Sequence, residues 1–307
     1  MQTDATRGLW PVMITPFTDG GEIDYASLER LIDWYEKNGA AGLFAACQSS
    51  EIFFLNLRER VELVRFVKTH AHVPVIASGH VACGLREQAD ELRQIEGAGA
   101  DALILITNRL VPAGRQQESM IPALEYLLRE LDPAVPLGFY ECPYPFKRLI
   151  TDEELRWAAE SGRFAFMKDT CCDIERIRGR IACIQGSPLQ LFNANSTTYL
   201  DSLRAGAAGF SGVMMNFHMD LYRWLFDNWE REPEKAEDLQ SFLTLFSEIE
   251  RQYYPVNAKY HLAAIEHVLS GICTRTIPAE GLTETFREEV RHMDRAAGLV
   301  RRMLSPA

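Results

Sequence analysis

The stretch NGAAGLFAAC, residues 38–47, joins the end of an amphipathic helical pattern to a short apolar run. Closely similar joints occur as GAGAD at 97–101 and as AGAAG at 205–209. Small residues at such a joint let a helix turn sharply back beneath the strand that follows it. The recurrence of the joint indicates that one supersecondary unit is used repeatedly along the chain.

Eight apolar runs have the length and composition of buried strands. They begin near Leu9, Ala41, Val73, Asp101, Val135, Phe164, Leu189 and Ala208. Intervals of 19 to 34 residues between these starts leave room for a helix and two loops, as parallel βα units require. The clearest helical patterns cover 24–39 and 85–99, and each closes at a glycine. Because no GxGxxG follows the first strand, the pattern predicts an α/β fold of the (β/α)8 TIM barrel type.

Strand signals stop near residue 221, and amphipathic helical patterns dominate the rest of the chain. We therefore expect a catalytic barrel over residues 1–220 and a C-terminal helical extension over residues 221–307, packed on the barrel. The aromatic and leucine stripes of this extension are typical of core or oligomer contacts. No chemistry is expected from the extension itself.

Composition excludes several classes of function. The 307 residues carry a formal net charge of -11, which argues against a nucleic-acid partner. The N-terminal sequence lacks the pattern of a secretory leader, and no run of about 18 apolar residues indicates a membrane partner. We expect a cytoplasmic protein. Its seven cysteines form no CxxC pair, so reduced thiols and no metal site are expected.

Two residues at predicted strand ends carry the chemistry. Lys168 ends the apolar run FAFMK, and Tyr140 ends the preceding run. If alternation turns both inward, they meet at the mouth of the barrel. A desolvated lysine there has a lowered pKa, and its free amine can form a Schiff base with a keto group. The simpler alternative is a lysine that marks the solvent-exposed rim of a strand.

The order of several motifs resembles the dihydrodipicolinate synthase and N-acetylneuraminate lyase family of class I aldolases. The motifs are GLWPVMITPFTDGGEIDYASLERLIDW, GLFAACQSSEIFFLNLRER, GFYECPYP, FMKDT and AGAAGFSGVMMN. The resemblance implies a pyruvate-like 2-keto acid bound as an imine to Lys168, with Tyr140 as proton shuttle and no cofactor. It also implies that Ser49, within the Gln48–Ser50 turn, binds the keto-acid carboxylate, that the Ser211–Gly212 backbone borders the imine, and that the protein is a homotetramer.

The chain departs from the family pattern at informative places. Residues 47–51 stand where the family has a GTTGE-like turn. Leu110 stands where synthases of the family carry a tyrosine of the proton relay. Pro145 stands where they carry the arginine that binds the carboxylate of the aldehyde partner. Arg109 is a new cation that could pair a second substrate carboxylate, although a surface arginine is the alternative. Glu141 follows Tyr140 and is expected to point away from it.

We therefore expect a Schiff-base lyase acting on pyruvate or a related 2-keto acid, with an atypical aldehyde partner. Sialic acid is disfavoured, because Ser196 and Thr197 fall where lyases of the family carry an acidic pair. One alternative is a 2-keto-3-deoxy sugar acid dehydratase that uses the same imine. Another is a keto-acid-binding protein without turnover.

Overall fold

A computed structural model describes residues 6–305 and shows eight parallel strands. The strands are β1 Gly8–Leu9, β2 Leu43–Ala45, β3 Val75–Ala77, β4 Ala102–Ile106, β5 Leu137–Tyr140, β6 Phe164–Asp169, β7 Gln190–Asn193 and β8 Gly209–Phe210. They follow one another around the sheet, and β1 pairs with β8. Parallel bridges between Leu9 and Ala40 and between Val12 and Phe44 connect the first segment to the second. The predicted barrel of eight βα units is confirmed.

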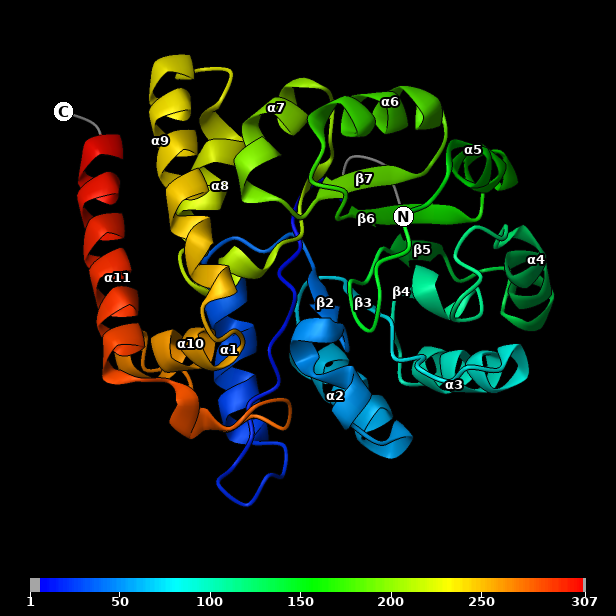
Figure 1. The fold of residues 1–307 in the computed structure, drawn as a ribbon, viewed down its shortest axis with the longest axis horizontal. Coiled ribbons are helices and arrows are strands. Elements are labelled where there is room, and N and C mark those ends of the chain that lie inside the picture. The colour runs from blue at the N-terminus through cyan, green and yellow to red at the C-terminus, as the bar shows by residue number, and fades with distance from the viewer. Residues whose placement is uncertain (1–5, 306–307) are drawn as a thin grey trace.

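A helix follows each strand and packs outside the sheet (Figure 1). These helices are α1 Tyr25–Lys37, α2 Leu57–His70, α3 Leu85–Gly97, α4 Ile121–Glu130, α5 Asp152–Ser161, α6 Ile174–Ile184, α7 Tyr199–Arg204 and α8 Met219–Asn228. Gly39 and Gly99, which close α1 and α3, have φ angles of 89° and 97°. The left-handed backbone at these joints explains the repeated small-residue pattern.

Within residues 6–305, three further α-helices follow: α9 Pro233–Phe246, α10 Val256–Tyr260 and α11 Glu284–Leu304. Figure 1 shows α9 and α11 side by side at one edge of the barrel, next to α8. Between α9 and α10 the chain forms the 3-10 turn η6, Ser247–Arg251, and runs toward the carboxyl ends of the strands. Of the helices within residues 6–305, none is both long and apolar enough to cross a membrane.

Aromatic side chains fill the barrel interior beneath the carboxyl ends of the strands. The Phe166 ring stacks on Phe192 with 4.2 Å between centroids, and Trp10 meets Phe166 edge-on at 5.4 Å. Phe44 also meets Phe166 edge-on, with 6.2 Å between the ring centroids. Lys168 lies two residues beyond Phe166 and therefore shares its inward face. The core thus forms an apolar floor under the lysine.

Candidate active site

The structure brings Lys168 and Tyr140 together. The two residues are directly paired in the register of β5 and β6. The Lys168 Nζ lies 4.2 Å from the centroid of the Tyr140 ring. Both side chains are buried, with exposed fractions of 3% and 4%. Alternation along two adjacent strands therefore places an amine and a phenol at the mouth of the barrel.

A cavity of about 550 Å³ opens above this pair. Five predicted site residues line it: Gln48, Ser49, Tyr140, Lys168 and Gly212. Tyr140 and Lys168 lie at the carboxyl ends of β5 and β6, and the other three residues follow β2 and β8, so all five meet at this face of the barrel. Active sites of TIM barrels lie at this face.

Burial makes Lys168 chemically unusual. Desolvation lowers the pKa of its ammonium from 10.5 to about 8, against smaller opposing effects of Cys47, Cys142 and Glu250. Within residues 6–305 no acceptor forms a hydrogen bond with Nζ. The amine is consequently deprotonated far more often than that of an exposed lysine at the same pH, and the free form can attack a carbonyl carbon.

Tyr140 is held as a neutral phenol. Its hydroxyl donates to Gln48 Oε1 at 3.4 Å, and the Cys142 thiol donates to the same oxygen at 3.2 Å. Burial raises the Tyr140 pKa well above 10.0. Gln48 therefore orients a phenol that can give a proton but seldom loses one spontaneously.

In the turn after β2, the adjacent hydroxyls of Ser49 and Ser50 have different surroundings. Ser49 lines the cavity, and its Oγ accepts a hydrogen bond from the Tyr254 hydroxyl at 2.7 Å. Ser50 lies outside the cavity lining, and its Oγ donates to the Met13 carbonyl at 2.7 Å. It also accepts the Cys47 amide at 3.2 Å. Ser49 is thus available to a ligand, whereas Ser50 braces the turn.

Glu51 anchors this turn to the C-terminal extension. Its backbone is left-handed, with φ 60°, and its carboxylate forms a fully buried ion pair with Lys259 at 2.7 Å. The same carboxylate accepts the backbone amides of Arg275 and Thr276 at 2.7 and 3.0 Å. The extension therefore fixes the loop that carries Ser49.

Ser211 and Gly212 also differ: Gly212 lines the cavity, whereas Ser211 lies outside the lining. The Ser211 hydroxyl is fully buried and donates to the Trp10 carbonyl at 2.8 Å, which ties β8 to β1. Gly212 lines the cavity, and a Cβ at this position would lie 2.7 Å from the Ala194 carbonyl oxygen. A side chain at this position would therefore clash with the backbone that follows β7.

Arg109 lies outside the cavity lining. Its guanidinium carbon is 5.0 Å from the centroid of the Phe53 ring, and Phe53 itself faces the cavity. Two other cationic residues, Lys147 and Arg251, line the cavity in its place. Lys147 donates to the Thr170 carbonyl at 2.8 Å, and Arg251 pairs with Glu248 at 3.0 Å.

A buried ion cluster lies behind the pair of Lys168 and Tyr140. Glu141 and Asp169, the residues after Tyr140 and Lys168, both point away from the cavity and bind Arg180 of α6. Glu141 meets Arg180 at 2.7 Å, and all three side chains are at most 1% exposed. The expected outward direction of Glu141 is confirmed. The cluster fixes the ends of β5 and β6 relative to each other.

Sequence reasoning missed the contribution of the C-terminal extension to the cavity. Glu250, Arg251 and Tyr254 line it, together with Thr276 and Ile277. The amphipathic pattern around these residues predicts packing alone. Pro255 was the available signal, because proline interrupts a helical pattern and marks a loop.

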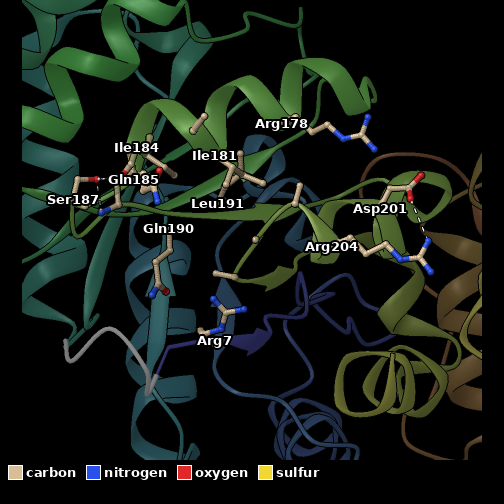
Figure 2. Close-up of a pocket in the computed structure, with 16 residues that line it drawn as sticks. Arg7, Arg178, Ile181, Ile184, Gln185, Ser187, Gln190, Leu191, Asp201 and Arg204 are labelled. Atoms are coloured by element: carbon tan, nitrogen blue, oxygen red, sulfur yellow. Dashed lines mark hydrogen bonds and ion pairs between the residues drawn. The ribbon is translucent and has the colours of Figure 1, made fainter. Parts of the chain in front are cut away.

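A second cavity, of about 660 Å³, lies at the opposite end of the strands (Figure 2). It is lined by Arg7, Arg204, Gln190 and residues of α6. Arg204 forms ion pairs with Asp201 and Glu237. No predicted site residue lines this cavity. Within residues 6–305, the one group of histidine and acidic residues close enough to share a metal ion is His261, Glu266 and Asp294, none of which lines either cavity.

The chain is similar in sequence to a known family and to several of its members. The model of the Dihydrodipicolinate synthetase family matches residues 5–296. The 4-hydroxy-tetrahydrodipicolinate synthase of Psychrobacter sp. (strain PRwf-1) is 25% identical over 304 residues, which cover 96% of this chain and 96% of that protein. The protein of the same name from Archaeoglobus fulgidus is 26% identical over 242 residues, 78% of this chain and 80% of that protein.

Solved structures share the fold. The pyruvate complex of dihydrodipicolinate synthase from Acinetobacter baumannii superposes with a TM-score of 0.82 at 20% identity, covering 95% of this chain and 99% of that one. YagE, a prophage protein of E. coli K12 solved with pyruvate, gives a TM-score of 0.81 at 20% identity, covering 96% and 98%.

Proposed function

Because this chain belongs to the dihydrodipicolinate synthetase family of carbon–carbon lyases, we propose that it forms an imine between Lys168 and a pyruvate-like 2-keto acid. The observation that carries this proposal is the buried Lys168 amine, 4.2 Å from the Tyr140 ring, at the floor of the cavity. Two structural neighbours were solved with pyruvate bound, which supports the choice of substrate.

The proposed reaction starts with attack of the Lys168 amine on the keto carbon. The Tyr140 phenol donates a proton as the carbinolamine loses water, and Gln48 holds that phenol in place. The Ser49 hydroxyl receives the keto-acid carboxylate at the other end of the molecule. The resulting imine withdraws electrons from the neighbouring carbon, so the chemistry requires no cofactor.

The aldehyde partner is proposed to differ from that of the synthases named among the relatives. Leu110 is buried at 5% exposure and offers no hydroxyl for proton relay, and Pro145 offers no guanidinium for a second carboxylate. Glu250 adds negative charge to the same cavity. These features favour a polar, uncharged partner. The homotetramer remains a proposal that rests on the resemblance.

Borohydride reduction in the presence of pyruvate tests the imine. Intact mass and peptide mapping should reveal one reduced adduct at Lys168 in the wild type and none in Lys168→Ala. Lys147→Ala is the matched control, because it removes another lysine of the same cavity and should retain the adduct. If pyruvate and longer 2-keto acids leave no adduct on the wild type, the proposed function is wrong.

A further inference from the structure

A histidine and two carboxylates meet beside the C-terminal helix, away from both cavities. They are His261, Glu266 and Asp294, and each offers one ligand atom within 4.8 Å of the other two. His261 begins the π-helical turn η7, His261–Ile265, which follows α10, and Asp294 belongs to α11. Figure 1 shows α10 next to α11. The Glu266 amide donates to the His261 carbonyl at 3.1 Å, so the wide π-helical turn brings these two residues together.

His261 is buried, and neither of its ring nitrogens forms a hydrogen bond within the described part of the chain. Its side chain is 1% exposed, and the buried Nδ1 has no partner among residues 6–305. Nε2 faces Asp294 Oδ1 at 3.7 Å and Glu266 Oε1 at 4.0 Å, and both distances exceed the length of a hydrogen bond. A polar ring that is removed from water and left unsatisfied is costly unless a ligand uses it.

The distances around Nε2 suit an ion placed between the three side chains. A divalent transition ion holds nitrogen and oxygen ligands at about 2.1 Å, so two ligands of one ion can lie up to about 4 Å apart. Both distances from Nε2 fall within this limit. The side chains of Glu266 and Asp294 are 27% and 29% exposed, which leaves room for small rotations and for water as a further ligand.

A hydrogen bond from a tryptophan orients one of the two carboxylates. Trp34 Nε1 donates to Glu266 Oε2 at 2.9 Å, and the other oxygen of the same carboxylate faces His261. Carboxylates that bind metal ions are commonly fixed by such a hydrogen bond from a neighbouring residue. Glu266 is therefore held in the direction that a shared ion requires.

The local charge favours a cation. Arg301 lies 3.8 Å from Asp294 Oδ1, but its guanidinium is already bound by both oxygens of Asp220, at 2.6 and 3.0 Å. Asp220, Glu266 and Asp294 thus share one guanidinium, and with a neutral imidazole the cluster has a net negative charge. An added divalent ion would neutralise it.

We propose that His261, Glu266 and Asp294 bind one divalent transition-metal ion. One imidazole and two carboxylates suit zinc and its neighbours in the first transition row. Mg²⁺ and Ca²⁺ require a larger set of oxygen ligands than this cluster offers. The proposal is independent of the imine at Lys168.

The bound ion would clamp α11 to the segment that fixes the loop of Ser49. His261 lies two residues after Lys259, whose side chain forms the buried ion pair with Glu51 in that loop. None of the three ligands lines either cavity, so the role of the ion is structural. Its binding should stabilise the folded protein against unfolding.

Cobalt(II) is the probe for this site. The chain has seven cysteines, and a thiolate ligand would add near-ultraviolet charge-transfer absorption that imidazole and carboxylate ligands lack. The full-length protein is first freed of metal with a chelator. Co²⁺ binding is then measured by equilibrium dialysis and absorption, and urea unfolding is recorded with and without the ion.

Asp294→Asn and Glu266→Gln test the two carboxylates, because they keep the size of each side chain and remove its charge. Glu288→Gln is the matched control. Glu288 lies on the same helix as Asp294 and faces His292 at 3.8 Å, but these two side chains are 53% and 71% exposed. Circular dichroism checks that each variant is folded before the ion is added.

For the wild type and Glu288→Gln we expect one Co²⁺ per chain, no thiolate band, and a higher urea midpoint with the ion. Asp294→Asn and Glu266→Gln should each bind Co²⁺ at least about tenfold more weakly and lose the shift of the midpoint. Excess Mg²⁺ should leave the ion in place on the wild type. The proposal would be overturned by a wild type that binds no Co²⁺ or by equal affinity in all three variants. A thiolate band, which would assign the ion to cysteines, or displacement by Mg²⁺ would also overturn it.

Discussion

Replacing Lys168 by methionine should stabilise the protein at neutral pH while abolishing imine formation. The lysine side chain is 3% exposed, and burial lowers its pKa from 10.5 to about 8. The folded state therefore holds an ammonium in surroundings that disfavour its charge. Methionine has a similar length and no charge, so it should fill the same space above Phe166 without this penalty.

The size of the effect follows from the difference between the two pKa values, 10.5 and about 8. Each pKa unit corresponds to about 1.4 kcal/mol, which gives a penalty of roughly 3 kcal/mol at pH 7. Below pH 8 the lysine is protonated in both states, and the full penalty applies. Between pH 8 and 10.5 the unfolded chain keeps a proton that the folded protein has released, so wild-type stability rises with pH. At pH 9.5 the penalty should have fallen to roughly 1.5 kcal/mol by the same relation.

Urea unfolding of both proteins at pH 7 and pH 9.5 measures this difference. Lys147→Met is the control, because this lysine is exposed and its replacement should change the free energy of unfolding by less than about 1 kcal/mol. The reasoning would be refuted if Lys168→Met were less stable than the wild type at pH 7. It would equally be refuted if the gain were the same at both pH values.

Two other substitutions test the supports of the site. Arg180→Met should lower the free energy of unfolding by about 3–5 kcal/mol in urea titrations, because Glu141 and Asp169 would remain buried without a partner. Gly212→Ala should slow borohydride-trapped adduct formation with pyruvate by about tenfold or more, because its Cβ would lie 2.7 Å from the Ala194 carbonyl oxygen. The Gly212 φ of -121° suits any residue, so this effect is steric.

Matched controls for both substitutions lie on α6. Arg178→Met removes an arginine that is 50% exposed and should change stability by less than about 1 kcal/mol. Gly179→Ala adds a methyl group with no atom within 4 Å and should leave adduct formation unchanged. Equal effects in a variant and its control would contradict the corresponding role.

The fold could be predicted because its signals are local and repeated. Apolar runs at regular intervals and glycines at helix ends are set by residues close together in the chain, and Gly39 and Gly99 adopt the left-handed backbone that the repeated joint requires. Alternation then placed Tyr140 and Lys168 on one face, as the paired register shows. Both inferences need only the period of a strand.

The rest of the site depends on contacts between distant segments. Whether Ser49 or Ser50 faces the cavity is decided by the Met13 carbonyl, which takes the Ser50 hydroxyl. Glu250 reaches the cavity because the buried pair of Glu51 and Lys259 draws the extension over the barrel. Separations of 37 residues for the first contact and 208 for the second leave no periodic pattern for a single sequence to reveal.

Glu141 and Asp169 share Arg180 as their partner, and this constrains the register of β5 and β6. Tyr140 of β5 and Lys168 of β6 are each followed at once by a carboxylate bound to Arg180, so inward and outward directions belong to consecutive positions. A slip by one residue would turn a carboxylate into the cavity and a lysine or phenol toward Arg180. An insertion or deletion within these strands would therefore both remove the side chains of Lys168 or Tyr140 from the cavity and destabilise the fold. Length variation should be confined to the loops.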